Sequence, residues 1–244
     1  MSRPGPLSRE GARPTPSNRL LLALPSSSLQ RLWPQLAPVH LTARQVVYRS
    51  DERIAAVYFV ESGLCSLMTT TRDGHSVESA AIGYEGLLGL TVGLGGPSMP
   101  VETIVQVPGS ALRLSVELFR RELARDAAVR DVVNRYAHAM LVHLLQTAAC
   151  NRLHGLEQRC CRWLLAARDR LNANTLPVTQ ELVATVLGVR RPSLTLALKS
   201  LQRAGAVVYR RGQIVILSRK TLEGTACECY AVVRGHLEKA LKGS

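Results

Sequence analysis

The pattern of apolar and polar positions divides the chain into a strand-rich half and a helical half. Between about residues 40 and 118, apolar runs of strand length alternate with turn residues. Asp73 and Gly74 stand between two such runs, and this dipeptide is a strong hairpin signal because both residues tolerate positive φ. We expect strands to stop at Gly63 and at Gly109. Several short strands at regular spacing predict a β-roll of the cupin-like type.

A long helix follows, because residues 127–150 contain no Gly or Pro and have helical apolar spacing. One stripe consists of Val129, Val133, Tyr136 and Met140, and an adjacent stripe consists of Ala137, Leu141, Leu144 and Ala148. An apolar surface this wide needs two partners, the chain's own roll and something else. We interpret the segment as a dimerisation helix, with the interface at Val133, Tyr136, Met140 and Leu144. The alternative is a helix that packs only on its own domain.

The strongest local signal lies between Thr179 and Gly205, where two short helical patterns flank a tight turn. Thr179 is a suitable N-cap, and Gly188 supplies a residue that tolerates a left-handed turn. Pro192 suits the first position of the second helix, and Gly205 suits the position just beyond its end. These signals in one register predict a helix-turn-helix rather than an ordinary helical hairpin.

A strand, a turn and a second strand follow the recognition helix over residues 206–217, which is the pattern of a winged helix. Arginines suit guanine edges and phosphates, and hydroxyl or amide side chains suit bases or phosphates. We therefore expect DNA contacts from Thr179, Gln180, Arg190, Arg191, Ser193, Thr195, Lys199, Arg203, Arg210 and Arg211.

The charge distribution supports a polyanionic partner. The 244 residues include 31 Lys and Arg against 18 Asp and Glu, a formal net charge of +13. Residues 151–244 hold 16 basic and 6 acidic side chains, so the basic surface belongs to the helical half. No apolar run reaches the roughly 18 residues of a membrane span. The first residues lack the apolar block of a signal peptide. We expect a cytoplasmic protein with no membrane partner.

The six cysteines do not predict a metal site from their spacing. We interpret them as reduced and mostly buried thiols. Cys227 and Cys229 form the one suggestive pair, and a redox or metal switch is the alternative for them. The roll also lacks the neighbouring His and carboxylate ligands of cupin-like enzymes, so we expect no catalytic residues.

The chain resembles the cAMP receptor protein/FNR (CRP/FNR) family of bacterial transcription regulators. The resemblance lies in the order of its parts: a roll of short strands, a Gly-rich turn, a long helix and a winged helix. The resemblance is most specific over residues 178–201 and 57–63. It implies an α+β protein that acts as a homodimer on palindromic double-stranded DNA and contacts RNA polymerase. The domains would be a disordered leader (1–18), the β-roll (19–126), the dimerisation helix (127–152) and the DNA-binding domain (153–244).

The sequence differs from the cyclic-nucleotide-binding members of the family at the positions that contact the nucleotide. The Gly-Glu step that binds the ribose is Gly89-Leu90 here, and the Arg-Ser or Arg-Thr pair for the phosphate falls at Met99-Pro100. We therefore expect that cyclic AMP does not control the protein in the usual mode, and that the pocket holds an apolar or neutral ligand, or nothing. The candidate pocket comprises Gly86, Leu87, Leu88, Gly89, Leu90, Met99 and Pro100.

Two other functions remain open from the sequence. The chain could be a sensor regulator of the same family that binds haem, through His75, His138 or His143, or another small ligand. It could also be a nucleotide-sensing module outside transcription, although such a module has no need for a winged helix.

Overall fold

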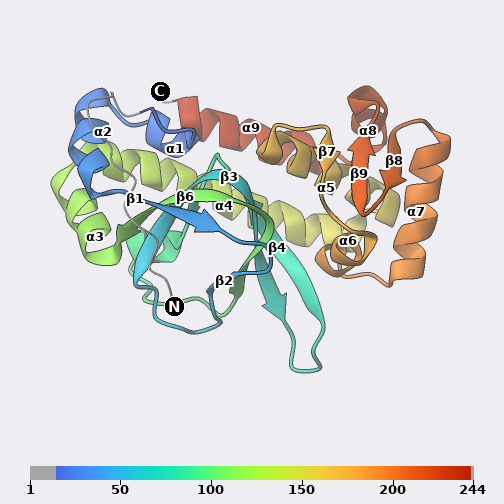
Figure 1. The fold of residues 1–244 in the computed structure, drawn as a ribbon, viewed down its shortest axis with the longest axis horizontal. Helices are drawn as coiled ribbons and strands as arrows, with labels where there is room; N and C mark the ends of the chain where they lie inside the picture. Colours follow the sequence, from blue (N-terminus) through green and yellow to red (C-terminus); the bar gives the residue numbers. More distant parts are fainter. Residues whose placement is uncertain (1–14, 243–244) are drawn as a thin grey trace.

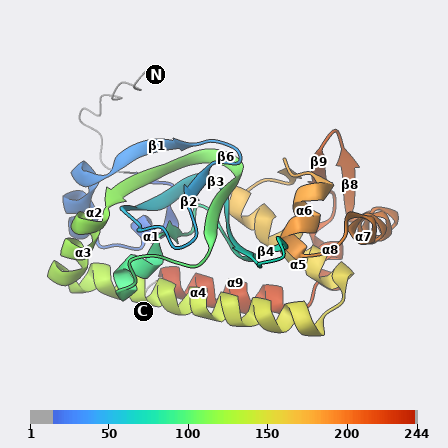
Figure 2. The same cartoon turned by 90° about the horizontal axis from the view of Figure 1, so that it is seen from below.

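The computed structural model describes residues 15–242 and is elongated, with the β-roll near one end and a winged helix at the other (Figure 1). Two long helices run side by side beneath both parts, as Figure 2 shows. None of the described helices combines the length and apolar character that crossing a bilayer requires.

The β-roll is preceded by short helices and built on a six-stranded antiparallel sheet in the order β1-β6-β3-β4, with β2 paired to β6 and β5 paired to β3. Its elements are α1 (Arg19–Leu22), α2 (Ser26–Leu32), η1 (Trp33–Gln35), β1 (Ala37–Leu41), β2 (Val46–Tyr48), β3 (Ala56–Thr70), β4 (Ser76–Ile82), β5 (Leu87–Leu88), η2 (Leu90–Leu94) and β6 (Glu102–Ser115).

The helical half follows with a small second sheet in the order β7-β9-β8. Its elements are α3 (Val116–Arg125), α4 (Ala127–Leu153), α5 (Leu156–Leu171), β7 (Thr175–Leu176), α6 (Gln180–Leu187), α7 (Arg191–Arg203), β8 (Val207–Arg210), β9 (Gln213–Ile216), α8 (Arg219–Thr225) and α9 (Cys229–Lys242). The predicted fold class, with its roll, long helix and winged helix, is confirmed.

Two strands continue through glycines that we expected to end them. β3 passes Gly63 and β6 passes Gly109, and their pairing shifts register around Ser62. A Cβ atom on Gly109 would lie 2.1 Å from the carbonyl oxygen of Ser62, so the two backbones touch here. Gly63 has a φ of +90°. The glycines therefore do not end the strands. They mark an irregularity in the pairing of two long strands, at a point where the two backbones approach closely.

The predicted leader is also shorter than expected where it can be judged. Residues 1–14 lie outside the described residues, but Asn18 is fully buried. Its side-chain amide donates to the carbonyl oxygens of Val60 and Gly86, each at 2.8 Å, and its Oδ1 accepts from the backbone of Leu21. Asn18 thus caps α1 and ties it to the roll.

The first face of α4 is buried by the chain's own roll, which corrects our predicted dimer interface. Val133, Tyr136 and Met140 are 3%, 1% and 8% exposed and belong to the core of the roll. The Tyr136 hydroxyl accepts a hydrogen bond from the backbone of Leu87 at 3.2 Å. Leu144 is half-buried against the same core. These apolar side chains cover the sheet, and three of them offer no surface to a second chain.

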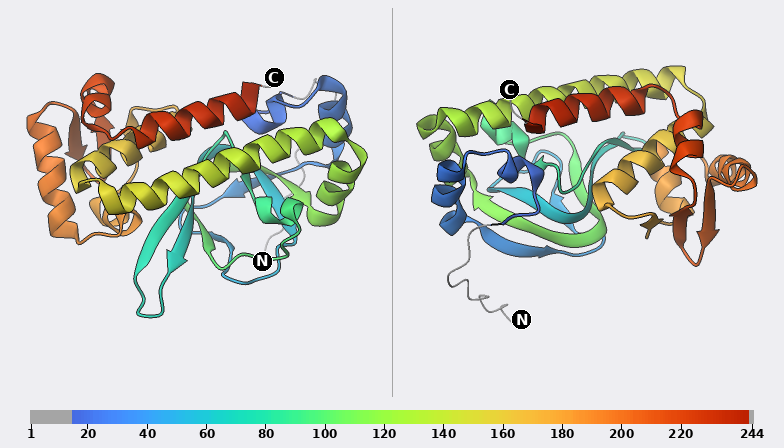
Figure 3. Two further views of the ribbon diagram at one scale, coloured as in Figure 1. Left: turned by 180° about the vertical axis from the view of Figure 1, so that it is seen from behind. Right: turned by 90° about the horizontal axis from the view of Figure 1, so that it is seen from above.

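The second face of α4 is covered by α9, which Figure 3 shows running alongside it. Arg135 of α4 donates to the carbonyl oxygen of Ala240, and the rings of His138 and His236 lie 5.8 Å apart. At its far end α9 joins the roll's core through Leu241. The last helix of the expected DNA-binding domain (153–244) therefore packs on α4 and the roll as well as on the winged-helix part, whose core includes Tyr230.

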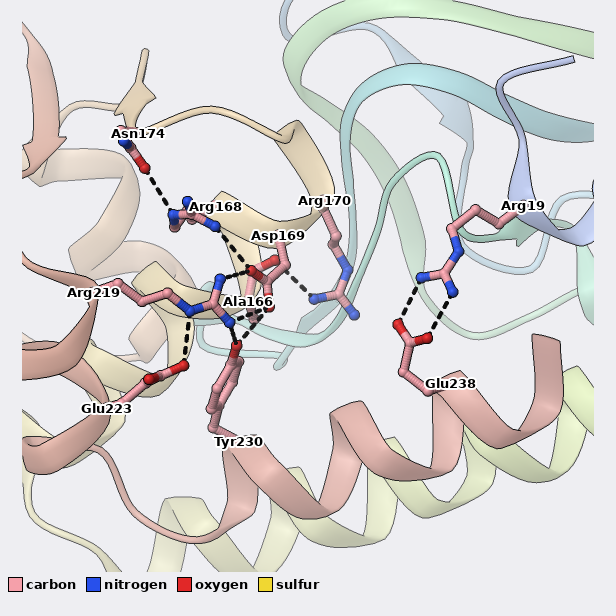
Figure 4. A network of polar contacts seen from close by, with 10 residues as sticks. All are labelled: Arg19, Ala166, Arg168, Asp169, Arg170, Asn174, Arg219, Glu223, Tyr230 and Glu238. Carbon is pink, nitrogen blue, oxygen red and sulfur yellow. Dashed lines mark hydrogen bonds and ion pairs between the residues drawn. The ribbon is translucent and has the colours of Figure 1, made fainter. Parts of the chain in front are cut away.

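A polar network joins α5, α8 and α9, as Figure 4 shows. Asp169 accepts from Arg219 at 2.7 Å and from the hydroxyl of Tyr230 at 2.6 Å. Further along α9, Glu238 pairs with Arg19 through both guanidinium Nη atoms at 2.8 Å. These contacts fix α9 to both ends of the molecule.

The roll and the winged helix share a buried junction. Glu78 of β4 accepts hydrogen bonds from Ser66 and, at 2.9 Å, from the indole of Trp163 on α5. Nearby, Arg170 of α5 pairs with Glu85 at 2.8 Å, and both side chains are less than 10% exposed. Buried polar groups need such partners, and here Trp163 and Arg170 supply them from the other part of the molecule.

Burial raises the pKa of the Glu78 carboxyl above its usual range, against the opposing effects of Ser66, Trp163 and Arg170. The folded state therefore holds the proton more tightly than the unfolded state. The protonated carboxyl therefore stabilises the folded state. This stabilisation is fully present below about pH 4.5, the pKa of the carboxyl in the unfolded chain, and is lost as the pH rises through the raised pKa of the folded state.

We expect Glu78→Gln to remove this pH dependence, because the amide keeps the shape of the side chain without its charge. Above about pH 4.5, the wild type should lose stability relative to the variant as the pH rises. Thermal melting of both proteins across that range checks this. A stability difference that does not change with pH, or one that shifts in favour of the wild type as the pH rises, would contradict it.

Candidate DNA-binding site and effector cavity

The helix-turn-helix forms as the sequence pattern predicts. Thr179 caps α6 by accepting from the backbone of Leu182 at 3.2 Å, and α6 ends at Gly188 with a φ of +63°. α7 begins at Arg191, one residue before Pro192, and Gly205 beyond its end has a φ of +68°. The packing between the helices is apolar, with Val183, Val186, Leu194 and Leu198 all buried.

The roll holds the turn of this motif in place. A Cβ atom on Gly188 would lie 3.2 Å from the nearest methyl of Val77 on β4. The core of the winged helix also includes Leu64 of β3 and Ala81 of β4. The DNA-binding part is therefore packed directly on the hairpin of the roll.

Eight of the ten predicted DNA contacts are exposed, and one of these eight, Thr179, is the N-cap of α6. The other seven are Arg190, Arg191, Ser193, Lys199, Arg203, Arg210 and Arg211. Arg191 lies 3.7 Å from the carboxylate of Glu181, and both side chains are about two-thirds exposed, at 65% and 70%. Such an exposed pair is worth little, so the guanidinium can turn toward a ligand.

The other three predicted contacts hold the motif together. The hydroxyl of Thr179 is used in the N-cap. The hydroxyl of Thr195 donates to the side-chain oxygen of Gln180 at 2.9 Å, and this bond joins α7 to α6. We predicted these three residues as DNA contacts from their positions in the sequence. In the structure, each of them makes a hydrogen bond within the helix-turn-helix.

The wing turn contains an arginine in an unfavourable backbone conformation. β8 and β9 are joined by Arg211 and Gly212, with φ of +47° and +77°. Two positive φ values are typical of a type I′ hairpin turn, where Asn or Gly is preferred at the first position. The backbone of Arg211 is therefore strained at this position. Backbone strain of this kind is often found at functional sites.

Leu196 is a candidate contact that the sequence analysis missed. It lies on α7 between Ser193 and Lys199, at helical spacing from both, and is 68% exposed. An apolar side chain on the outer face of a recognition helix can contact the methyl group of thymine. The sequence contains a signal for this contact, because residues three apart share one face of a helix and Leu196 lies three residues from both Ser193 and Lys199.

A cavity of about 410 Å³ lies between the roll and α4, mostly lined by apolar side chains. Leu87, Gly89, Leu90 and Met99 of the predicted pocket line it, whereas Gly86, Leu88 and Pro100 do not. From α4 the lining includes His138, Leu141 and Leu144. No carboxylate is among its lining residues in the described chain, and its single arginine is the exposed Arg49, which the sequence analysis missed.

The three histidines considered for haem lie in different surroundings. His75 is 88% exposed at the β3–β4 turn. His143 is buried, and burial together with Arg170 and Arg162 lowers its pKa well below the usual value, so it is neutral. Of the three, only His138 lines the apolar cavity.

The comparisons with known proteins agree with this architecture. Residues 38–126 match the cyclic nucleotide-binding domain family, and residues 158–225 match the Crp-like helix-turn-helix domain family. No curated protein sequence matched the chain.

Several solved structures share the fold. FixK2 from Bradyrhizobium japonicum has a TM-score of 0.70 at 19% identity, over 79% of this chain and 98% of that chain. CLP from Xanthomonas campestris, described as a cyclic di-GMP-responsive global regulator, has a TM-score of 0.66 at 18% identity, over 80% of this chain and all (100%) of that chain. A CRP-family regulator from Thermus thermophilus has a TM-score of 0.58 at 19% identity, over 77% and 96%.

A roll of the cyclic nucleotide-binding domain family followed by a Crp-like helix-turn-helix domain defines a DNA-binding transcription regulator. The chain belongs to the CRP/FNR family.

Proposed function

We propose that two copies of this chain form a regulator that reads a palindromic operator in bacterial DNA and contacts RNA polymerase, without enzymatic activity. The observation that carries the proposal is the set of exposed cationic side chains on α7 and at the wing tip. Base edges select the sequence, and phosphate contacts supply most of the salt-dependent affinity. A two-fold dimer presents two recognition helices to two half-sites.

Arg191→Ala tests base reading, using operators selected from a random DNA pool. Loss of a contact to a base edge should cost about 1–3 kcal/mol at one position of each half-site and relax the preference there. Fluorescence anisotropy with a panel of single-base variants measures this. Unchanged affinity and unchanged base preference would contradict the assignment of α7.

Arg211→Asn is the matched control, because Asn tolerates the left-handed conformation that Arg211 adopts. We expect the fold to remain and all sequences to bind more weakly to a similar degree. The slope of log affinity against log salt should fall by about 1.

The third face of α4 supports the homodimer. Leu141 and Leu145 are 55% and 63% exposed, and Ala148 continues their stripe at heptad-like spacing. In Figure 3 (left), α4 runs along the outside of the molecule, with α9 on one side and the roll behind it. Large exposed leucines in a row on a long helix are typical of a surface that another chain covers.

Leu145→Asp should therefore give a folded monomer, because it places an unpaired carboxylate in the proposed interface. A loss of at least about 3 kcal/mol, roughly 100-fold in dimer affinity, is expected. Analytical ultracentrifugation checks this. Leu22→Asp is the matched control, since Leu22 is 54% exposed on α1 and should leave the dimer intact.

Met140→Asp should behave differently from Leu145→Asp, because Met140 lies in the chain's own core. We expect a lower melting temperature rather than a clean change of mass. A folded Leu145→Asp protein that stays dimeric would contradict the assigned interface.

We propose that the effector is an apolar molecule in the cavity between the roll and α4. Because Arg49 stands in its lining, the ligand can carry one acidic group. Since the same cavity is lined by Leu141 of the proposed interface, a bound effector would contact the helix that joins the two copies. Haem ligated by His138 is the second candidate, and an absorption spectrum of the haem-loaded protein tests it.

Cyclic AMP and cyclic GMP should give no calorimetric heat at sub-millimolar concentration. Each missing hydrogen bond to a charged group costs about 1.5–3 kcal/mol. Loss of both the ribose and the phosphate contacts moves a micromolar ligand into the millimolar range, because each 1.4 kcal/mol is about tenfold. Micromolar binding of cyclic AMP with a matching rise in operator affinity would overturn this. Cyclic di-GMP belongs in the same titration as a ligand able to use arginines outside the cavity.

A further inference from the structure

Four side chains with metal-binding atoms converge where α4 ends and α9 begins. They are Cys150 in the last turn of α4, His154 just beyond the end of that helix, Cys227 in the connection before α9, and Cys229, the first residue of α9. Their ligand atoms all lie within 4.8 Å of one another, and the three cysteines are buried. The sequence spacing did not predict this, because the two pairs are far apart in the chain.

We propose that these four side chains bind a single zinc ion. Three thiolates and one imidazole form a familiar ligand set for tetrahedral structural zinc, with Zn–S distances of about 2.3 Å and Zn–N distances of about 2.0 Å. Such lengths place neighbouring ligand atoms roughly 3.5–3.8 Å apart.

The described distances agree with this geometry. The Sγ atoms of Cys150 and Cys227 are 3.5 Å apart, and the Sγ of Cys229 is 3.5 Å from Nδ1 of His154. Four ligand atoms this close leave room for one ion between them. A cluster of several irons and sulfides would hold its ligands further apart.

The outer partners of the ligands are also those of a metal site. Nε2 of His154 faces the carboxylate of Glu228 at 3.3 Å, which turns Nδ1 toward the cysteines. A carboxylate on the far nitrogen of a ligating histidine is the usual arrangement, since it fixes the tautomer and the ring orientation. The side-chain amide of Gln146 donates to the Sγ of Cys229 at 3.2 Å, as amide groups do toward bound thiolates.

The charge around the cluster suits three thiolates. With a zinc ion they carry a net charge of −1, which needs compensation in a buried place. Arg162, 8% exposed, and Arg159 act electrostatically on Cys150 from α5. The Nε atoms of both arginines are buried without a hydrogen-bond partner in the described structure.

The position of the site gives it a consequence for the fold. The winged helix occupies residues 155–226, so it begins just after His154 and ends just before Cys227. One ion would therefore clamp both chain connections of the DNA-binding part to the end of α4. Loss of the metal should make the start of α9 more mobile and the orientation of the DNA-binding part less fixed.

The experiment measures metal in the full-length protein, purified with its thiols reduced. We expect one zinc ion per chain by inductively coupled plasma mass spectrometry. Replacement by Co²⁺ should give the visible absorption bands of a tetrahedral thiolate site. Cys229→Ser should lose both signals, whereas Cys160→Ser, a buried cysteine outside the cluster, should keep both.

Two further variants keep the test decisive if Cys229→Ser fails to fold. Glu228 is 68% exposed, so Glu228→Gln should fold normally and bind zinc about 10–100-fold more weakly in competition with a chelator. His154→Cys should retain the ion with four thiolates. These readouts need no DNA, so failure of the metal site and failure of the proposed regulator are distinguishable.

The proposal is overturned if the reduced wild type purifies without zinc and binds neither Zn²⁺ nor Co²⁺ when they are supplied. A disulfide between Cys150 and Cys227 in a protein that takes up no metal would also overturn it. Equal zinc affinity of the wild type and Glu228→Gln would contradict the role of the carboxylate.

Discussion

The burial of α4 is the constraint on which the other parts of the structure depend. The helix spans Ala127–Leu153 and carries apolar side chains on more than one face. The roll covers one face around Tyr136, where Gly86 leaves so little space that a Cβ would lie 2.3 Å from the tyrosine hydroxyl. α9 covers a second face. The remaining stripe of exposed leucines is the surface that the proposed dimer would bury, because burial of apolar area is favourable.

The same helix and the hairpin of β3 and β4 connect the cavity to the winged helix. Leu67 of β3 and Ile82 of β4 line the cavity. At the start of β4, Glu78 accepts a hydrogen bond from Trp163, and Val77 lies against the turn glycine Gly188. A ligand that shifted this strand would therefore act on the DNA-binding part through packed contacts. Such coupling requires that the ligand bind two arrangements of these contacts with different affinity.

The sequence predicted those features that local chemistry determines. The helix-turn-helix was recognisable because caps, turn glycine and apolar spacing are all set within a short segment, from Thr179 to Gly205. The irregularity at Gly63 and Gly109 was misread as two strand ends, because a glycine in a turn and a glycine at close backbone contact look the same in sequence.

Features that depend on long-range packing could not be predicted in the same way. Two apolar stripes on α4 were visible, but which stripe faces the roll depends on the partner surface, so Met140 was assigned to the wrong side. The path of α9 back along α4 left no local signal. For the same reason, the meeting of Cys150 and His154 with Cys227 and Cys229 was not foreseen.

The central claim is that a two-fold pair of these chains reads DNA with both recognition helices. Selection of bound sequences from a random duplex pool by the full-length protein tests it most directly. We predict an inverted repeat whose half-sites lie about 10–10.5 base pairs apart, centre to centre, or a multiple of that. Enrichment of a single asymmetric site, or of no sequence at all, would contradict it.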